Sequence, residues 1–288
     1  MKTVFYTDGK RFYDDTIALL EKNELQNNLL IGNATYACDF IRNEDVFVCV
    51  VDKSIELIGT MTPPFNFVLY AVDNKINIDA VECLVDSLIE RNINIPGFLA
   101  DKELSELFSC RYADKSKQIK KAGTSMRIYR LDKINPELPK IPGVFRQAVE
   151  ADIQYMGEWF HSFEVECGMN QAGNMDEETA KALEAIKGGN CFVWDDNGAV
   201  ATAKNDRRIK NAACINGVYT PPHFRKRGYA TACVAALSQK LLNDGFDYCY
   251  LFTDLANPIS NSIYQKIGYF PVCDYDEWMI ENPNKKSR

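Results

Sequence analysis

The stretch Val218-Tyr219-Thr220-Pro221-Pro222-His223-Phe224-Arg225-Lys226-Arg227-Gly228-Tyr229-Ala230-Thr231 joins an apolar strand, a basic loop and the start of an amphipathic helix. The first turn of a helix has backbone N–H groups that lack acceptors within the helix. A glycine allows a ligand to approach the backbone closely, and neighbouring cations attract negative charge. Together these features predict a pyrophosphate-binding site.

Each part of this loop has a predicted role. The run Arg225 to Arg227 supplies positive charge, Gly228 permits the close approach, and Tyr229 to Thr231 present the N–H groups of the first helical turn. Apolar residues further along the same helix form one face that packs on a sheet. An ordinary basic turn before a surface helix has the same composition, so the loop alone is a weak signal.

A second segment, Asn257-Pro258-Ile259-Ser260-Asn261-Ser262-Ile263-Tyr264-Gln265-Lys266-Ile267-Gly268-Tyr269-Phe270, follows the apolar strand at 248–253. Asn257 suits the N-cap of a helix and Pro258 its first position, and Gly268 suits the C-terminal cap. The segment therefore predicts a short helix over 258–267.

In this order and spacing, the two segments resemble two motifs of the GNAT family of N-acetyltransferases. Residues 225–230 match the family's coenzyme A-binding pattern, Gln/Arg-x-x-Gly-x-Gly/Ala. Residues 257–269 are similar to Asn-x-x-Ala-x-x-x-Tyr-x-x-x-Gly-Phe, with Ser260 in place of alanine and Tyr269 in place of phenylalanine. The resemblance covers residues 145–288, approximately the second half of the chain.

The resemblance implies acetyl transfer from acetyl-CoA to an amine by direct attack, without a covalent enzyme intermediate. It also implies that the strand before the basic loop splays from its neighbour, and that the backbone of Val218 and Thr220 binds the pantetheine arm. Pro221 and Pro222 lack N–H donors and agree with an end to sheet pairing there. Asn257 and Ser260 complete the implied cofactor-binding set, and Asn257 also suits a capping role.

Tyr264 matches the family's tyrosine near the sulfur atom. A phenol with a reference pKa of about 10 can protonate a departing thiolate whose reference pKa is about 8.5. A half-buried tyrosine of the core is the alternative for this position.

The general base is left open by the sequence. Glu164, Glu166 and His161 end an aromatic helix in a region that often walls the acceptor site of the family, and each also suits a solvated surface. Asn216 cannot act as a base, so a water relay is a further option. The aromatic residues of the same helix, Trp159, Phe160 and Phe163, suit an acceptor pocket or ordinary core packing.

The chain is expected to contain two tandem GNAT-like domains of the α/β (α+β) class. Each is expected to have a mixed, mostly antiparallel sheet, with a splayed strand pair in the second. We place a degenerate domain at 1–134, a proline-rich connector at 135–143 and the catalytic domain at 144–288. In the first domain the nearest counterpart of the loop is Asn94–Glu103, which has no basic cradle. That copy is therefore not expected to bind coenzyme A.

Composition limits the partners. A net charge of -7 argues against a general nucleic-acid binder, and no apolar run is long enough to predict a membrane span. Ten cysteines without Cys-x-x-Cys spacing favour reduced thiols in a cytoplasmic protein, and only two histidines make a His-based metal site improbable.

The expected acceptor is a primary amine of a small molecule or of a protein. Its identity, the acyl length and the oligomeric state are left open by the sequence. Two alternatives also remain: a non-catalytic acyl-CoA sensor, and a peptidyl or aminoacyl transferase of the tandem-GNAT type.

Overall fold

The computed structural model describes residues 1–168 and 173–283, and the chain forms two compact units. The first unit contains Met1–Ile128, Asp254–Ala256 and Cys273–Arg288, and the second contains Tyr129–Thr253 and Asn257–Val272. These units differ from the predicted division at 135–143, because the chain returns to the first unit after Val272. The predicted domain limits stay a prediction. Among the described residues, no helix has the length and hydrophobicity needed to cross a membrane.

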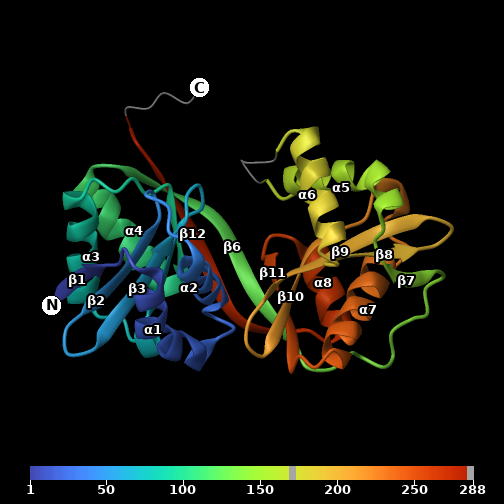
Figure 1. Ribbon diagram of the computed structural model, residues 1–288, viewed down its shortest axis with the longest axis horizontal. Coiled ribbons are helices and arrows are strands. Elements are labelled where there is room, and N and C mark those ends of the chain that lie inside the picture. The colour runs from blue at the N-terminus through green and yellow to red at the C-terminus, as the bar shows by residue number, and fades with distance from the viewer. Residues whose placement is uncertain (169–172, 284–288) are drawn as a thin grey trace. The chain divides into compact units, whose positions relative to one another are not determined.

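The same order of elements occurs twice along the chain (Figure 1). Each copy has one strand, two helices, three strands, and then helix, strand, helix and strand. The first copy comprises β1 (Lys2–Phe5), α1 (Gly9–Leu20), α2 (Asn28–Asp39), β2 (Val46–Val51), β3 (Ile55–Met61), β4 (Phe67–Ala71), α3 (Ile78–Glu90), β5 (Gly97–Asp101), α4 (Lys102–Ser116) and β6 (Ile119–Leu131). The second comprises β7 (Val144–Gln147), α5 (Ile153–Glu166), α6 (Met175–Lys187), β8 (Cys191–Asp195), β9 (Ala199–Arg208), β10 (Ala212–Tyr219), α7 (Tyr229–Asn243), β11 (Tyr248–Asp254), α8 (Pro258–Ile267) and β12 (Phe270–Glu281).

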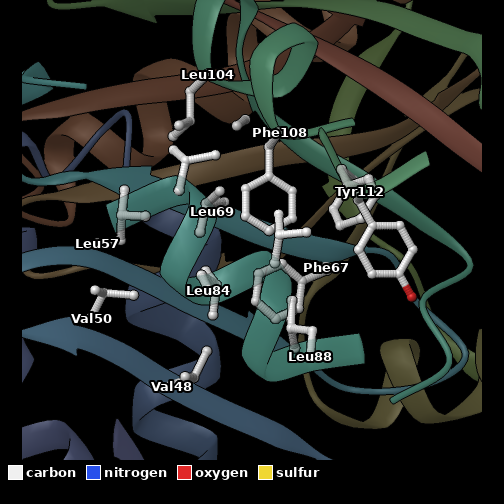
Figure 2. Packing of buried hydrophobic residues seen from close by; sticks show 14 of the residues in the cluster. Val48, Val50, Leu57, Phe67, Leu69, Leu84, Leu88, Leu104, Phe108 and Tyr112 are labelled. Atoms are coloured by element: carbon white, nitrogen blue, oxygen red, sulfur yellow. The ribbon is translucent and has the colours of Figure 1, made fainter. Parts of the chain in front are cut away.

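In the first unit the strands lie in the order β1, β2, β3, β4, β5 and β12. β4 and β5 are parallel and the other neighbours are antiparallel, so the last strand of the chain completes this sheet. Helices α3 and α4 cover one face of it, where Phe67 and Phe108 pack between the two layers (Figure 2). The ring of Phe98 packs edge-on against both.

In the second unit the neighbours run β6, β11, β10, β9, β8 and β7. β10 and β11 are parallel, but they pair only from Ala212 to Cys214 on β10 and from Tyr248 to Tyr250 on β11. Beyond these three positions the two strands have no pairing with each other. The mixed α+β sheet and its splayed strand pair are therefore as the sequence predicted.

A β-bulge in β10 reverses the face of the sheet to which its side chains point before and after the bulge. The register against β9 shifts on either side of Asn216, and the adjacent Gly217 has a positive φ of 54°. Ile215 packs with α7 and α8, whereas Tyr219 packs with α5 and α6 on the opposite face. An unbroken strand would turn both side chains to one face, so the bulge reverses the alternation.

The start of α5 is held by a buried ion pair. Asp152, only 3% exposed, accepts two hydrogen bonds from Arg146 of β7, at 2.6 and 2.9 Å. It also accepts one from the Val149 N–H at 2.8 Å and one from the Tyr155 hydroxyl. Burial opposes ionisation of this carboxyl, but these hydrogen bonds outweigh it and lower the pKa of Asp152 to about 2.

Asp152→Asn is expected to lower the free energy of unfolding at pH 7 by about 2 kcal/mol, because the pKa in the folded state lies below the ordinary value. The contribution of the carboxylate is complete above its ordinary pKa of 3.8 and is lost as the pH falls toward about 2. Urea unfolding of wild type and variant across this pH range measures the difference. Asp244→Asn, in the exposed pair with Lys240, is the control and should change the free energy by less than about 0.5 kcal/mol. Equal stability of Asp152→Asn and wild type at pH 7 would contradict the assignment.

Candidate cofactor and acyl-transfer site

The basic loop between β10 and α7 is exposed and its backbone donors are available. Helix α7 begins at Tyr229 without a side-chain cap, and its first backbone hydrogen bond runs from the Ala232 N–H to the Gly228 carbonyl at 3.0 Å. Within the described parts of the chain, the N–H groups of residues 226–231 donate to no protein acceptor. This is the state that a phosphate-binding helix start requires.

The three cations of the loop have different surroundings. Arg225 donates through Nη2 to both carboxylate oxygens of Glu166, at 2.7 and 2.8 Å, and through Nε to the Thr220 carbonyl at 2.8 Å. Lys226 and Arg227 are exposed, and no described carboxylate lies within ion-pair distance of either. The positive charge that remains for a ligand is therefore mainly that of Lys226 and Arg227.

Neighbouring segments fix the loop in place. The Tyr229 hydroxyl donates to Asp196 in the β8–β9 turn at 2.5 Å, and the Tyr229 ring packs edge-on against Phe224. Gly228 has a positive φ of 86°, and a Cβ there would lie 2.7 Å from Cδ1 of Ile141. Glycine is required at this position for its conformation and for the space it leaves to Ile141.

The second motif forms the helix that the sequence predicted. The Asn257 side chain accepts from the Ser260 N–H at 3.0 Å, Pro258 opens α8, and Gly268 ends it in the left-handed region with φ 118°. The capping role of Asn257 is thus confirmed. The roles of Asn257 and Ser260 in cofactor binding remain predictions.

Tyr264 lies in the core that α7 and α8 form with the sheet. Its side chain is 8% exposed and contacts the rings of Tyr129 and Tyr269, with centroids 6.5 and 6.0 Å away. Burial raises the pKa of Tyr264 well above its ordinary value of 10, and the nearby thiols Cys167 and Cys214 add to the shift. The phenol therefore keeps its proton at neutral pH and can act as a donor.

The predicted cofactor-binding backbone follows the point where β10 and β11 part. Val218 lies on β10 beyond the last paired residue, Cys214, and Thr220 follows directly after the strand. The Thr220 hydroxyl oxygen is buried and has no hydrogen-bond partner in the described part of the chain. The structure therefore places both residues beside the unpaired edge.

The candidate bases at the end of α5 all have partners within the protein. Glu166 binds Arg225, Glu164 lies 3.4 Å from Nζ of Lys181, and Nδ1 of His161 lies 3.0 Å from the Gly173 carbonyl oxygen. None of the three is thus an unengaged base in this arrangement. The ion pair between Glu166 and Arg225 was not predicted, because 59 residues separate the two in sequence.

The aromatic residues of α5 pack in the core. Trp159 and Phe160 are 7% and 6% exposed, and Phe163 packs against the same cluster of α5, α6 and the sheet. Trp159 also contacts the rings of Tyr155 and Tyr219. Core packing therefore accounts for their positions, and a role in lining an acceptor site stays a prediction.

Comparison with known protein families identifies the family of the region that contains this site. Residues 154–269, which contain both motifs, match the model described as the Acetyltransferase (GNAT) family. This region belongs to the GNAT family. Comparison with the curated proteins found none that matches the chain.

Solved structures of GNAT proteins share the fold over nearly the whole chain. The GCN5-related N-acetyltransferase from Sphaerobacter thermophilus aligns with a TM-score of 0.67 at 13% identity, covering 99% of this chain and 98% of its own. The GNAT-family acetyltransferase from Colwellia psychrerythraea aligns with a TM-score of 0.60 at 12% identity, covering 98% and 100%. A tandem GNAT protein from the clavulanic acid biosynthesis pathway aligns with a TM-score of 0.57 at 9% identity, covering 99% of each chain. These likenesses show a GNAT-like fold for both copies.

The first copy has its counterpart of the GNAT cofactor loop at residues 72–77, between β4 and α3. The sequence-based choice, Asn94–Glu103, was wrong, because that segment spans β5 and the start of α4 and corresponds to β11 and α8. Residues 72–77 contain Asp73, which pairs with Lys22 at 3.4 Å, and have no run of cations.

The double variant Lys226→Gln/Arg227→Gln is expected to weaken acetyl-CoA binding about 10-fold or more at low salt, because it removes the two exposed charges of the loop. The difference from wild type should shrink as salt is added, since exposed charges are screened. Calorimetric titration at two salt concentrations measures both effects. Lys240→Gln, a charge change elsewhere on α7, is the matched control. Equal affinities of wild type and double variant at low salt would remove these cations from the site.

Proposed function

We propose that this protein transfers an acetyl group from acetyl-CoA to a primary amine of a small molecule or of a protein. The observation that carries the proposal is the row of N–H groups at residues 226–231, which donate to no described protein acceptor. They open helix α7 beside two exposed cations, where the field of a helix start favours phosphates. Membership of residues 154–269 in an acetyltransferase family supports acyl transfer.

The chemistry proposed for the site is a direct displacement. The amine nitrogen attacks the thioester carbonyl carbon, the C–N bond forms, and the C–S bond then breaks. Tyr264 donates its proton to the departing sulfur, since burial keeps the phenol protonated at neutral pH. The nitrogen loses a proton to water, and Tyr264 regains one from water, so the products are an amide and coenzyme A.

The unpaired part of β10 supports a place for the pantetheine arm. An extended polar chain can satisfy backbone groups much as a neighbouring strand does, and the arm carries amide groups suited to this. We infer that Val218 and Thr220 make these contacts, with the diphosphate at the start of α7.

The state of the cysteines supports a cytoplasmic location. All ten are free thiols, and five of them, Cys49, Cys191, Cys214, Cys233 and Cys249, are almost fully buried. Burial raises the pKa of Cys49 and of Cys249 to about 12, which makes both thiols unreactive. Reduced thiols of this kind are typical of proteins in reducing compartments, and we propose the cytoplasm.

Ala230→Glu tests the phosphate site. Ala230 is half-buried in the first turn of α7, where a carboxylate suits the helix but repels a diphosphate. We expect Ala230→Glu to weaken acetyl-CoA binding about 100-fold or more in calorimetry, by charge repulsion and by occupation of the donors.

The control for this test is Ala230→Gln, which adds similar bulk without the charge and should retain more affinity than the glutamate variant. Gly228 is a poorer target because any side chain there meets Ile141 and has an unfavourable φ. Unchanged affinity in Ala230→Glu, with a native circular dichroism spectrum, would refute the proposed phosphate site and the function built on it.

Tyr264→Phe tests the proton donor. We expect kcat to fall about 10-fold or more while the Kd for acetyl-CoA changes little, because the hydroxyl acts only as the thiolate leaves. Loss of the thioester in the presence of a panel of small amines and amine-bearing peptides measures kcat. The role is refuted if the variant turns over at the wild-type rate.

A further inference from the structure

Tyr250 stands at the point where the two central strands of the second unit separate. It pairs with Cys214, and this is the last of the three paired positions between β10 and β11. Beyond this pair the strands diverge, and the gap that opens is the place proposed above for the pantetheine arm. A side chain on this pair is therefore next to the inner end of the gap.

The two faces of the sheet carry different phenols at this point. Cys249 and Leu251 belong to the cluster with α7 and α8, as does Tyr264. Because side chains alternate along a strand, Tyr250 points to the opposite face. Tyr250 and Tyr264 therefore belong to opposite faces of the sheet.

The Tyr250 hydroxyl is an unusual group for a protein interior. Its residue is fully buried, and its oxygen makes no hydrogen bond of ordinary geometry in the described part of the chain. The Cys214 thiol on the paired strand is close enough to interact with it weakly and to raise its pKa, after burial. Two other buried tyrosines of this protein have partners: the Tyr269 hydroxyl pairs with Ser238 at 2.8 Å, and that of Tyr112 donates to the Ile93 carbonyl at 3.2 Å. A buried polar group without a protein partner is destabilising unless water or a ligand binds it.

Acyl transfer at this gap needs a group that orients the nucleophile. The sequence suggested three candidate bases at the end of α5. Each of them contacts another protein group: Glu164, Glu166 and His161. Tyr264 lies on the face from which the thiol would be protonated. The opposite face has the unpartnered hydroxyl of Tyr250.

We propose that the Tyr250 hydroxyl positions the nucleophile, either the amino group of the acceptor or a water molecule in its place, where β10 and β11 part. This inference rests on the proposed function and adds a nucleophile-positioning residue to it. In the reaction with water, the water oxygen bonds to the carbonyl carbon, the C–S bond breaks, and sulfur takes a proton from Tyr264. The bound water loses one proton to solvent as it attacks, and the acetic acid formed loses a second at neutral pH. Tyr264 regains one proton from solvent, so the products are acetate, coenzyme A and a proton.

Hydrolysis of acetyl-CoA by the full-length protein tests this role without knowledge of the acceptor. Tyr250→Phe keeps the ring and removes only the hydroxyl, and we expect the saturated rate of hydrolysis to fall about 10-fold or more. The Kd for acetyl-CoA by calorimetry should stay within about 2-fold of wild type, because the hydroxyl is assigned to the nucleophile and not to the cofactor. Tyr112→Phe is the matched control. It removes a buried phenol hydroxyl in the first unit and should leave the hydrolysis rate unchanged.

Several outcomes would overturn the inference. If Tyr250→Phe hydrolyses acetyl-CoA at the wild-type rate and unfolds at a higher urea concentration, the hydroxyl has no role in the reaction. A variant that no longer binds acetyl-CoA would show a structural role, and a wild type that binds acetyl-CoA without accelerating its hydrolysis would show that no water is positioned. Failure of the wild type to bind acetyl-CoA at all is a different result, which refutes the proposed function itself.

Discussion

The second unit depends on the early end of hydrogen bonding between β10 and β11. Parallel neighbours in the interior of a sheet normally pair along their shared length, because unpaired backbone groups are costly when buried. Here pairing ends at Cys214 and Tyr250, and the bulge at Asn216 and Gly217 turns the rest of β10. A sheet interrupted in this way leaves an internal edge, and an extended ligand with its own amide groups can occupy such an edge.

Side-chain contacts hold the loop that follows β10, while the N–H groups of residues 226–231 have no described protein acceptor. Arg225 binds Glu166 at the end of α5, Tyr229 binds Asp196 in a hairpin turn, and Ile141 packs over Gly228. Side chains therefore restrain the loop from several directions, and its N–H groups take no part in these contacts. Such preorganisation lowers the entropic cost of binding a ligand, because the donors need no rearrangement. Arg225 contributes to this restraint, whereas Lys226 and Arg227 supply the uncompensated charge.

Local sequence signals predicted the parts of the site that depend on local backbone geometry. The cap at Asn257, the end of α8 at Gly268 and the exposed start of α7 each follow from residues a few positions apart. Contacts between distant residues had no such signal. The pairing of β12 with β5, the ion pair of Glu166 with Arg225 and the position of Tyr250 at the last strand pair arise only when the sheet assembles.

The two copies show that this topology alone does not make an anion site. The first copy also has a parallel strand pair, β4 and β5, which pairs only at Phe67–Val68 and Phe98–Leu99, and a helix follows β4 after a short connection. In that connection Asp73 and Asn74 have φ near 55°, and a carboxylate lies where the second copy has its cations. The order of elements is thus repeated, but the run of cations is missing: the charged residues of this connection are Asp73, which pairs with Lys22, and Lys75. The run of cations and the N–H groups without acceptors at the start of α7, more than the arrangement of strands and helices, therefore distinguish the second copy as the one suited to a nucleotide cofactor.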